Sequence, residues 1–365
     1  MPCSSRPTRL REDLATHCCE APRLALQRVT VVGCLGGGQL GRMLALAGLP
    51  LGLRFRFLDP AADACAGEVG ELLVGSYDDP VLLDRLAAGT DAVTFEFENV
   101  PVAAARHVAA VPGPLALEEG QDRLREKELF RRLGIPTARF GGLDETGLPA
   151  LAKSRRLGYD GKGQRRLGHG DMLRDDELAE EIVPFARELS IVAVRGRRGE
   201  LGFYPLAENA HRDGILRLTW VPARDAPEQI ARDYVRALLE ELDYVGVLAL
   251  ELFEVDGGLL ANEFAPRVHN SGHWTIDAAV TSQFENHLRA ILGLPLGPTD
   301  ALAPCAMVNL VGSAPPLPEL LTLPGAHVHL YGKSPRDGRK LGHVTLVEPD
   351  EATIGKALAL AGVEL

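Results

Sequence analysis

The sequence predicts an α/β protein with a doubly wound parallel sheet at its N-terminal end and a small β-rich domain at its C-terminal end. Three observations lead to this prediction. The chain has 365 residues, more than one hydrophobic core usually serves, so two or three domains are expected. Apolar strands alternate with helical patterns from residue 28 onwards, which favours parallel strands joined by crossover helices. Strand patterns and glycine-rich loops dominate the remainder.

The N-terminal domain is expected at 28–121. The stretch 1–27 is polar, of mixed charge and without steady periodicity, and we expect it to be a disordered tail outside the fold. The domain opens with the β-branched run 28–34, a glycine loop and a helical pattern. Further strands are expected in LRFRFLD, which ends at Asp59, and in DAVTFEFENV.

The second domain is expected at 122–304, with a lid at about 150–190. Its start is marked by a charged helical segment that begins at Gln121 and is closed by Gly134 and Pro136. The last segment, 305–365, carries strand patterns in HVHLYG and GHVTLV and is predicted to form the β-rich cap.

The composition excludes several classes of protein. With 46% hydrophobic and 24% charged residues, the chain is that of a globular protein. A net charge of −11 argues against nucleic-acid binding, which needs a basic footprint. The cysteines have no CxxC or His-Cys spacing typical of zinc sites. No apolar run approaches the roughly 20 residues of a membrane helix, and no signal-peptide core is present, so we predict a cytoplasmic protein without membrane contact.

The glycine loop Gly36–Gly41 satisfies the GxGxxG pattern between a strand and a helix. Asp59 ends the next strand, where a ribose-binding acid would sit. Backbone N–H groups at a helix N-terminus can bind any phosphate, so the loop alone does not identify a dinucleotide. Three interpretations stay open: a nicotinamide dinucleotide, the phosphate of another substrate, and a structural tight turn.

Two basic turns are candidates for phosphate binding in this acidic chain. The first, 153–164, places Lys153 and Lys162 around a glycine-rich turn, where lysine charges can neutralise phosphates. The second, 331–343, gathers Lys333, Arg336, Arg339 and Lys340. A solvated basic surface is the alternative for both turns.

Two apolar strands around Asp256-Gly257-Gly258 predict a hairpin. A three-residue loop centred on Gly257 would set Glu251 opposite Glu263, whereas a two-residue turn would set Glu251 opposite Asn262. Opposed carboxylates repel each other and would be protonated or bridged by a cation. Mg²⁺, which prefers one or two carboxylates plus substrate phosphates, fits that demand. A solvated carboxylate pair is the alternative.

The stretch 265–275 follows this hairpin and is dense in polar side chains. An Arg, two His, an Asn, a Ser and a Trp lie within nine residues, which is unusual for a core strand. Because Arg binds planar carboxylates with a bidentate fork, this cluster predicts an anion site.

Taken together, these segments resemble the N5-carboxyaminoimidazole ribonucleotide synthetases, a family of ATP-grasp ligases in purine biosynthesis. The resemblance rests on GGGQLGRMLALA, TFEFENVP, GYDGKGQ, RELS, ENAHRDGI, NEFAPRVHNSGHWT, TSQFE and YGK…GRKLGH, and it spans about 29 to 348. APRVHNSGHWT followed by TSQFE is highly specific, whereas the glycine loop is weak. The family implies an ATP-grasp architecture in which ATP lies between two sheets.

The resemblance also implies an ATP site and a metal site. The phosphates of ATP would be bound by Arg123, Lys153, Gly158, Tyr159, Asp160, Gly161, Lys162, Gly163 and Gln164. The adenine would meet Glu180, Glu181, Ile182 and Val183, the ribose Glu188 and the nucleotide edge His211. Glu251 and Glu263, with Asn262, would hold Mg²⁺ or Mn²⁺ beside the ATP.

The same resemblance assigns the remaining substrates. Bicarbonate would be bound by Arg267, His269 and Asn270, which with Lys153 are the implied catalytic residues. The ribonucleotide would be bound by Gly37, Gly38, Gln39, Glu96 or Glu98, Tyr159 and Asp160, with Lys333, Arg339 and Lys340 at its phosphate.

The implied reaction is the carboxylation of 5-aminoimidazole ribonucleotide with bicarbonate and ATP, through carboxyphosphate, by a homodimer. Another ATP-grasp ligase and a nicotinamide-dependent oxidoreductase that uses Gly36–Gly41 are the alternatives. The chain departs from the family pattern in the lid, where it is short between Pro136 and Lys153 and again between Gln164 and Glu180. The second gap leaves a polar stretch, DELAEE, where an apolar strand is usual.

Overall fold

The computed structural model describes residues 29–158 and 163–364. The predicted tail and the four residues Tyr159 to Lys162 of the first basic turn therefore lie outside the described residues. Within the described ranges, no helix is both long enough and apolar enough to cross a membrane.

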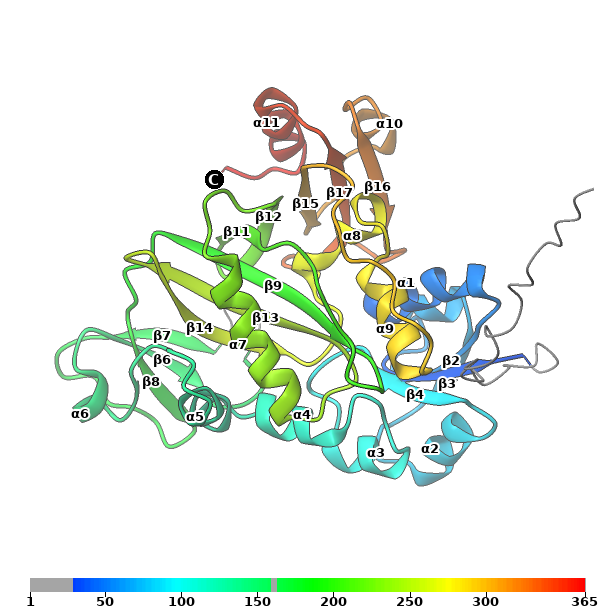
Figure 1. Ribbon diagram of the computed structural model, residues 1–365, viewed down its shortest axis with the longest axis horizontal. Helices are drawn as coiled ribbons and strands as arrows, with labels where there is room; N and C mark the ends of the chain where they lie inside the picture. The colour runs from blue at the N-terminus through cyan, green and yellow to red at the C-terminus, as the bar shows by residue number, and fades with distance from the viewer. Residues whose placement is uncertain (1–28, 159–162, 365) are drawn as a thin grey trace, which may run out of the picture.

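The predicted N-terminal parallel sheet is confirmed, with the strand order β3-β2-β1-β4. Apolar residues such as Val32 and Leu35 are buried, because helices cover both faces of a parallel sheet (Figure 1). The strand expected in DAVTFEFENV ends early, at Phe95, so Glu96 and Glu98 follow the carboxyl edge of the sheet. The elements are β1 (Val31–Leu35), α1 (Gln39–Gly48), β2 (Arg54–Asp59), β3 (Glu71–Val74), α2 (Pro80–Ala87), β4 (Ala92–Phe95), α3 (Val102–His107) and α4 (Pro114–Gly120).

A separate four-stranded sheet, which we call the lid sheet, has the strand order β5-β8-β6-β7. Its buried apolar core is small and consists of Ala150, Ala152, Leu167 and Ala179. The unusual polar strand is explained by ion pairs, since Glu177 pairs with Arg165 and Glu181 with Arg139, each at 2.7 Å. The elements are α5 (Arg123–Arg132), β5 (Phe140–Gly141), α6 (Leu143–Thr146), β6 (Ala150–Ser154), β7 (Gln164–Leu167) and β8 (Glu177–Glu181).

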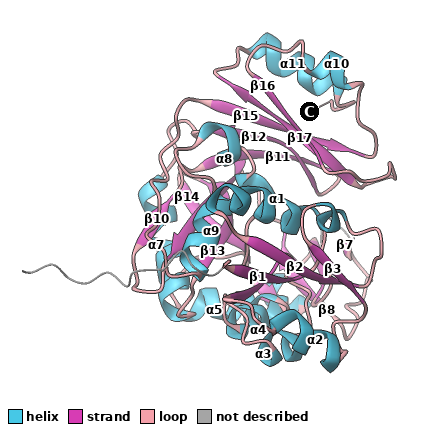
Figure 2. Ribbon diagram, turned by 90° about the vertical axis from the view of Figure 1, so that its right-hand side faces the viewer, coloured by secondary structure: helices cyan, strands magenta, loops and turns pink. Residues whose placement is uncertain are grey.

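A nine-stranded antiparallel sheet forms the rest of the molecule, in the order β14-β13-β9-β11-β12-β15-β17-β16, with β10 paired to β9. Pairing of β12 with β15 carries this sheet across residue 305, so the C-terminal strands continue the central sheet (Figure 2). Its strands are β9 (Arg187–Arg195), β10 (Leu201–Phe203), β11 (Ala207–Arg212), β12 (Ile215–Val221), β13 (Gly246–Val255), β14 (Gly258–Ala265), β15 (Cys305–Val311), β16 (Ala326–Leu330) and β17 (Lys340–Val347).

Helices pack on both faces of this sheet. Because successive side chains of a strand point to opposite faces, β13 contributes to two cores. Leu248 and Leu250 pack with helix α7, whereas Val247 and Ala249 pack in the core that contains α9 and α1. The helices are α7 (Glu228–Glu241), α8 (Thr275–Ala278), α9 (Gln283–Ile291), α10 (Leu317–Leu320) and α11 (Glu351–Leu360).

Candidate active site

A cleft of about 780 Å³ lies among the N-terminal domain, the lid sheet and the nine-stranded sheet. It brings together most of the residues singled out in the sequence, although they come from every part of the chain. The predicted residues on its wall are Gln39, Glu98, Arg123, Lys153, Gly158, Gly163, Gln164, Glu188, His211, Glu251, Asn262, Glu263, Arg267, His269, Asn270, Lys333, Arg339 and Lys340.

The backbone N–H groups of the glycine loop donate hydrogen bonds to carboxylates of the same chain. The N–H of Gly37 donates to Asp59 at 2.8 Å, and the N–H groups of Gly38 and Gly41 donate to the two oxygens of Glu96. A pyrophosphate would have to displace both carboxylates, so this loop is a poor dinucleotide site. Glu96 is only 7% exposed and supports the loop from within, while Gln39 reaches the cleft.

The stretch predicted to meet adenine, 180–183, is absent from the described lining of the cleft. Glu180 is buried and accepts a hydrogen bond from the Lys153 ammonium at 2.9 Å, with the Lys127 ammonium 3.3 Å away. Burial acts to raise the pKa of Glu180, but the two lysines lower it to about 2. Glu180 is thus an ionised anchor that positions Lys153 on the cleft wall.

The hairpin of β13 and β14 sets Glu251 opposite Glu263, as one of the two registers predicted. The expected three-residue loop is wrong, however, because Val255 pairs with Gly258 across a two-residue turn at Asp256 and Gly257. Both turn residues have positive φ, of 50° and 77°, which the favoured hairpin turn requires. A bulge between the turn and Glu251 shifts the register by one residue and restores the facing pair.

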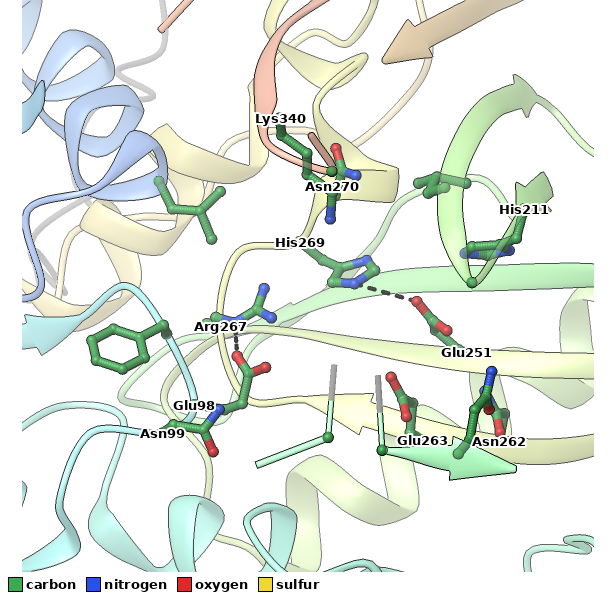
Figure 3. Close-up of a pocket in the computed structure, with 18 of the residues that line it drawn as sticks. Glu98, Asn99, His211, Glu251, Asn262, Glu263, Arg267, His269, Asn270 and Lys340 are labelled. Atoms are coloured by element: carbon green, nitrogen blue, oxygen red, sulfur yellow. Dashed lines mark hydrogen bonds and ion pairs between the residues drawn. The ribbon is translucent and has the colours of Figure 1, made fainter. Parts of the chain in front are cut away.

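The side chains of Glu251 and Glu263 project from neighbouring strands (Figure 3), and their pKa values are shifted in opposite directions. Burial and the negative charge of Glu263 raise the pKa of Glu251 to about 7. For Glu263, whose side chain is 41% exposed, partial burial is opposed by Arg123, which donates a hydrogen bond at 2.9 Å and keeps the pKa below its usual value. Beside them, the side-chain oxygen of Asn262 is buried and has no hydrogen-bond partner in the described part of the chain. The three residues offer oxygen atoms of the kind that Mg²⁺ prefers.

His269 links this pair to the predicted anion cluster. Its Nδ1 accepts a hydrogen bond from the N–H of Ser271, which leaves the proton on Nε2, 3.3 Å from Glu251. Burial, together with the charges of Arg267 and Lys340, lowers the pKa of His269 well below its usual value. His269 is therefore a neutral imidazole whose Nε2 lies close to the Glu251 carboxylate.

Arg267 and Asn270 stand on either side of His269 (Figure 3). Arg267 donates through Nε to the half-buried Glu98, and this contact outweighs partial burial and lowers the pKa of Glu98 to about 2. Both amide atoms of Asn270 are buried and lack hydrogen-bond partners among the described residues. Because unpaired buried polar groups are costly, this amide is suited to a small ligand with both donor and acceptor groups.

The second basic turn reaches the N-terminal domain. Lys333 donates a hydrogen bond to the side chain of Gln39, so two segments predicted to bind one ligand meet across almost the whole chain length. Arg339 and Lys340 lie on the same wall. On the far side, His211 lies 2.8 Å from Glu188.

The structure adds residues that the sequence interpretation missed. Phe185 and Phe253 stack at 4.7 Å between ring centroids and form an apolar part of the wall. Side chains two residues apart on a strand point to the same face, so Phe253 lies on the same face of β13 as Glu251. Phe253 could therefore have been predicted from the sequence. Lys127, the buried partner of Glu180, is a further residue that was missed, whereas Arg336, already named in the second basic turn, also lines the cleft.

Paired carboxylates, lysines and an unpaired amide between two sheets are features expected of a nucleotide-dependent ligase of the ATP-grasp class. Family models agree along the chain. Residues 29–119 match the ribonucleotide synthetase preATP-grasp domain, 129–284 the ATP-grasp domain, and 305–357 the phosphoribosylaminoimidazole carboxylase C-terminal domain.

Relatives narrow the class to one family. The N5-carboxyaminoimidazole ribonucleotide synthase of Pseudomonas aeruginosa is 48% identical over 90% of this chain and 97% of its own length. The synthetase structure from Thermus thermophilus is 51% identical, with a TM-score of 0.84 over 92% of this chain and 99% of that one. An Aspergillus clavatus synthase structure in complex with ADP and 5-aminoimidazole ribonucleotide is 32% identical, with a TM-score of 0.83 over 92% and 99%. The chain belongs to the N5-carboxyaminoimidazole ribonucleotide synthase family.

Proposed function

We propose that this chain carboxylates 5-aminoimidazole ribonucleotide with bicarbonate and ATP, giving N5-carboxyaminoimidazole ribonucleotide, ADP and phosphate. The observation that carries the proposal is that one cleft holds three distinct binding groups. The first group is the pair of facing carboxylates, and the second is the unpaired amide of Asn270 with Arg267 and His269. The third group is the second basic turn. They suit a metal nucleotide, bicarbonate and a ribonucleotide phosphate respectively.

The residues of the first group fit Mg²⁺. Glu251, Glu263 and the unpaired oxygen of Asn262 are all hard oxygen ligands, which Mg²⁺ or Mn²⁺ prefers. A cation there would relieve the repulsion that raises the pKa of Glu251. When bound, it would neutralise charge on the ATP phosphates during transfer.

Residues of the chain would position the nucleotide around that site. Arg123 and Lys153 are fixed by Glu263 and Glu180, so their charges are held in place for the phosphates. Glu188 is the proposed ribose acceptor, and the aromatic pair Phe185 and Phe253 offers the apolar surface that a base requires.

The middle group would position bicarbonate. Asn270 can both donate and accept hydrogen bonds, and Arg267 supplies positive charge beside it. A bicarbonate oxygen would attack the terminal phosphorus of ATP, with ADP leaving, to form carboxyphosphate. The exocyclic amine of the ribonucleotide would then attack the carboxyl carbon, releasing phosphate and one proton. Carboxyphosphate hydrolyses in water, so the cleft must exclude solvent between these steps.

The basic turn would bind the ribonucleotide phosphate. Lys333, Arg339 and Lys340 are proposed as its cationic partners, and the contact of Lys333 with Gln39 supports a receptor built from both ends of the chain. This assignment leaves Glu96 as a support of the glycine loop and Glu98 as the partner of Arg267.

ADP release in Mg²⁺ tests the proposed function. The expected result is rapid release only when aminoimidazole ribonucleotide and bicarbonate are both present, and loss of release in EDTA. ADP release that is unchanged when the ribonucleotide is replaced by another amine, or NAD(H) turnover instead, would overturn it. The family further suggests a cytoplasmic homodimer, which we propose on resemblance alone.

A further inference from the structure

A second group of side chains of metal-ligating types lies on the C-terminal strands and helix α8, outside the described lining of the cleft. Strands β16 and β17 pair with His329 directly opposite His343, and the two rings stack at 4.6 Å between centroids. Side chains two residues apart share a face of a strand, so His327 lies on the same face as His329. One face of this strand pair therefore presents three imidazoles.

Asp277 of helix α8 completes the group. One of its carboxylate oxygens lies 2.8 Å from Nε2 of His329, and the other lies 3.6 Å from Nδ1 of His327. Ligand atoms of Asp277, His329 and His343 all lie within 4.8 Å of one another. Such a spacing lets a single cation reach all three with small side-chain movements.

His343 supplies an independent sign of a missing ligand. The residue is fully buried, its Nδ1 lies 2.7 Å from the hydroxyl of Tyr331, and its Nε2 has no hydrogen-bond partner within the described residues. The hydroxyl of Thr345, two residues along the same strand face, is also buried and unpaired there.

We propose that Asp277, His329 and His343, with His327 as fourth ligand, bind a divalent transition-metal cation of the Zn²⁺ type. Imidazole nitrogens with one carboxylate suit Zn²⁺, whereas Mg²⁺ prefers oxygen ligands. In this arrangement the Nδ1–H of His343 would donate a hydrogen bond to the hydroxyl of Tyr331, and Nε2 would bind the ion. A histidine that binds a metal through one nitrogen usually donates a hydrogen bond through the other.

The ion would join two parts of the chain behind the cleft. It would tie α8, which follows the anion loop, to β16 and β17, on either side of the basic turn. Tyr331 both contacts His343 and lines the cleft, so the site would hold this wall in place. The proposal does not depend on which reaction the cleft performs.

Titration calorimetry of the EDTA-stripped, desalted full chain with ZnCl₂ tests the proposal. We expect one Zn²⁺ per chain and a rise of the unfolding temperature. Asp277→Asn and His329→Gln should each weaken Zn²⁺ binding by at least about tenfold. Loss of a residue that only hydrogen-bonds to a metal ligand already costs about that much affinity, so loss of a ligand itself should cost no less. His107→Gln is the matched control, because His107 is an exposed histidine paired to Asp84 in the N-terminal domain. No 1:1 binding by the parent, or unchanged affinity in both site variants, would overturn the proposal.

Two further measurements keep the result clear. Glu251→Gln should keep the Zn²⁺ event, because Glu251 lies in the cleft; loss of binding there would place the ion at the carboxylate pair and overturn the proposal. Should the site variants not fold, histidine modification of the parent by diethylpyrocarbonate, mapped by mass spectrometry, decides the matter. Zn²⁺ should protect His327 and His329 but not His107, and equal labelling with and without Zn²⁺ would count against the site.

Discussion

Replacing Glu251 by Gln should stabilise the metal-free protein at alkaline pH while abolishing phosphoryl transfer. The carboxyl has a pKa of about 7 in the folded chain against an ordinary value of 4.5. At roughly 1.4 kcal/mol for each of the 2.5 pH units between these values, ionising Glu251 costs the folded state about 3.5 kcal/mol. The cost is absent below about pH 4.5 and complete above about pH 7, so the parent loses this stability as the pH rises.

Urea unfolding in EDTA, followed by tryptophan fluorescence at pH 5 and pH 8, measures the effect. Near pH 5 Glu251→Gln and the parent should have similar free energies of unfolding, and at pH 8 the variant should be more stable by up to about 3.5 kcal/mol. Glu254→Gln is the matched control, since Glu254 lies on the same strand but pairs with Arg187 and should gain nothing at pH 8. A Glu251→Gln protein that is less stable than the parent at pH 8, or that still releases ADP normally in Mg²⁺, would refute the reasoning.

Three other predictions concern the cleft and the assembly of the chain. Arg339→Ala and Lys340→Ala should each raise the KM for the ribonucleotide about tenfold or more while changing the KM for ATP little, because a lost phosphate contact weakens the ligand it holds; equal effects in steady-state assays would remove this role. NAD(H) should give no heat in calorimetry while ATP with Mg²⁺ binds, because Asp59 and Glu96 occupy the loop amides; tight NAD(H) binding would contradict this. Light scattering should give about 78 kDa, twice the chain mass of 39.2 kDa, and a 39 kDa species at all concentrations would exclude the homodimer.

Local patterns in the sequence were sufficient to predict the parallel sheet and the hairpin, but not the register that makes the two carboxylates face each other. The run at Val31 to Leu35, the glycine loop and the strand ending at Asp59 all lie within thirty residues, so neighbouring residues determine them. The facing of Glu251 and Glu263 was predicted correctly from the wrong turn. A two-residue turn and a bulge at Asn262 together give the same register, and a bulge leaves no reliable mark in a single sequence.

Contacts between distant segments could not be predicted in the same way. The polar strand β8 looked anomalous because its partners, Arg165, Arg139 and Lys153, belong to other strands or to the preceding linker. Lys127 sits on a helix that reads as charged and exposed, yet its ammonium is fully buried against Glu180. The histidines and the aspartate of the proposed Zn²⁺ site are separated by up to 66 residues, from 277 to 343. They therefore form no short sequence motif from which a metal site could be predicted.

The pairing of β12 with β15 has a consequence for any attempt to shorten the chain. The family models end one domain at 284 and begin the next at 305, which invites a cut between them. Removing the C-terminal strands would leave the backbone groups of Leu218 to Val221 unpaired along an open edge. It would also uncover Leu218 and Trp220, which pack against the core of the last segment. A long apolar edge strand is a template for pairing between molecules, so a chain cut near 304 should precipitate rather than fold as a smaller enzyme.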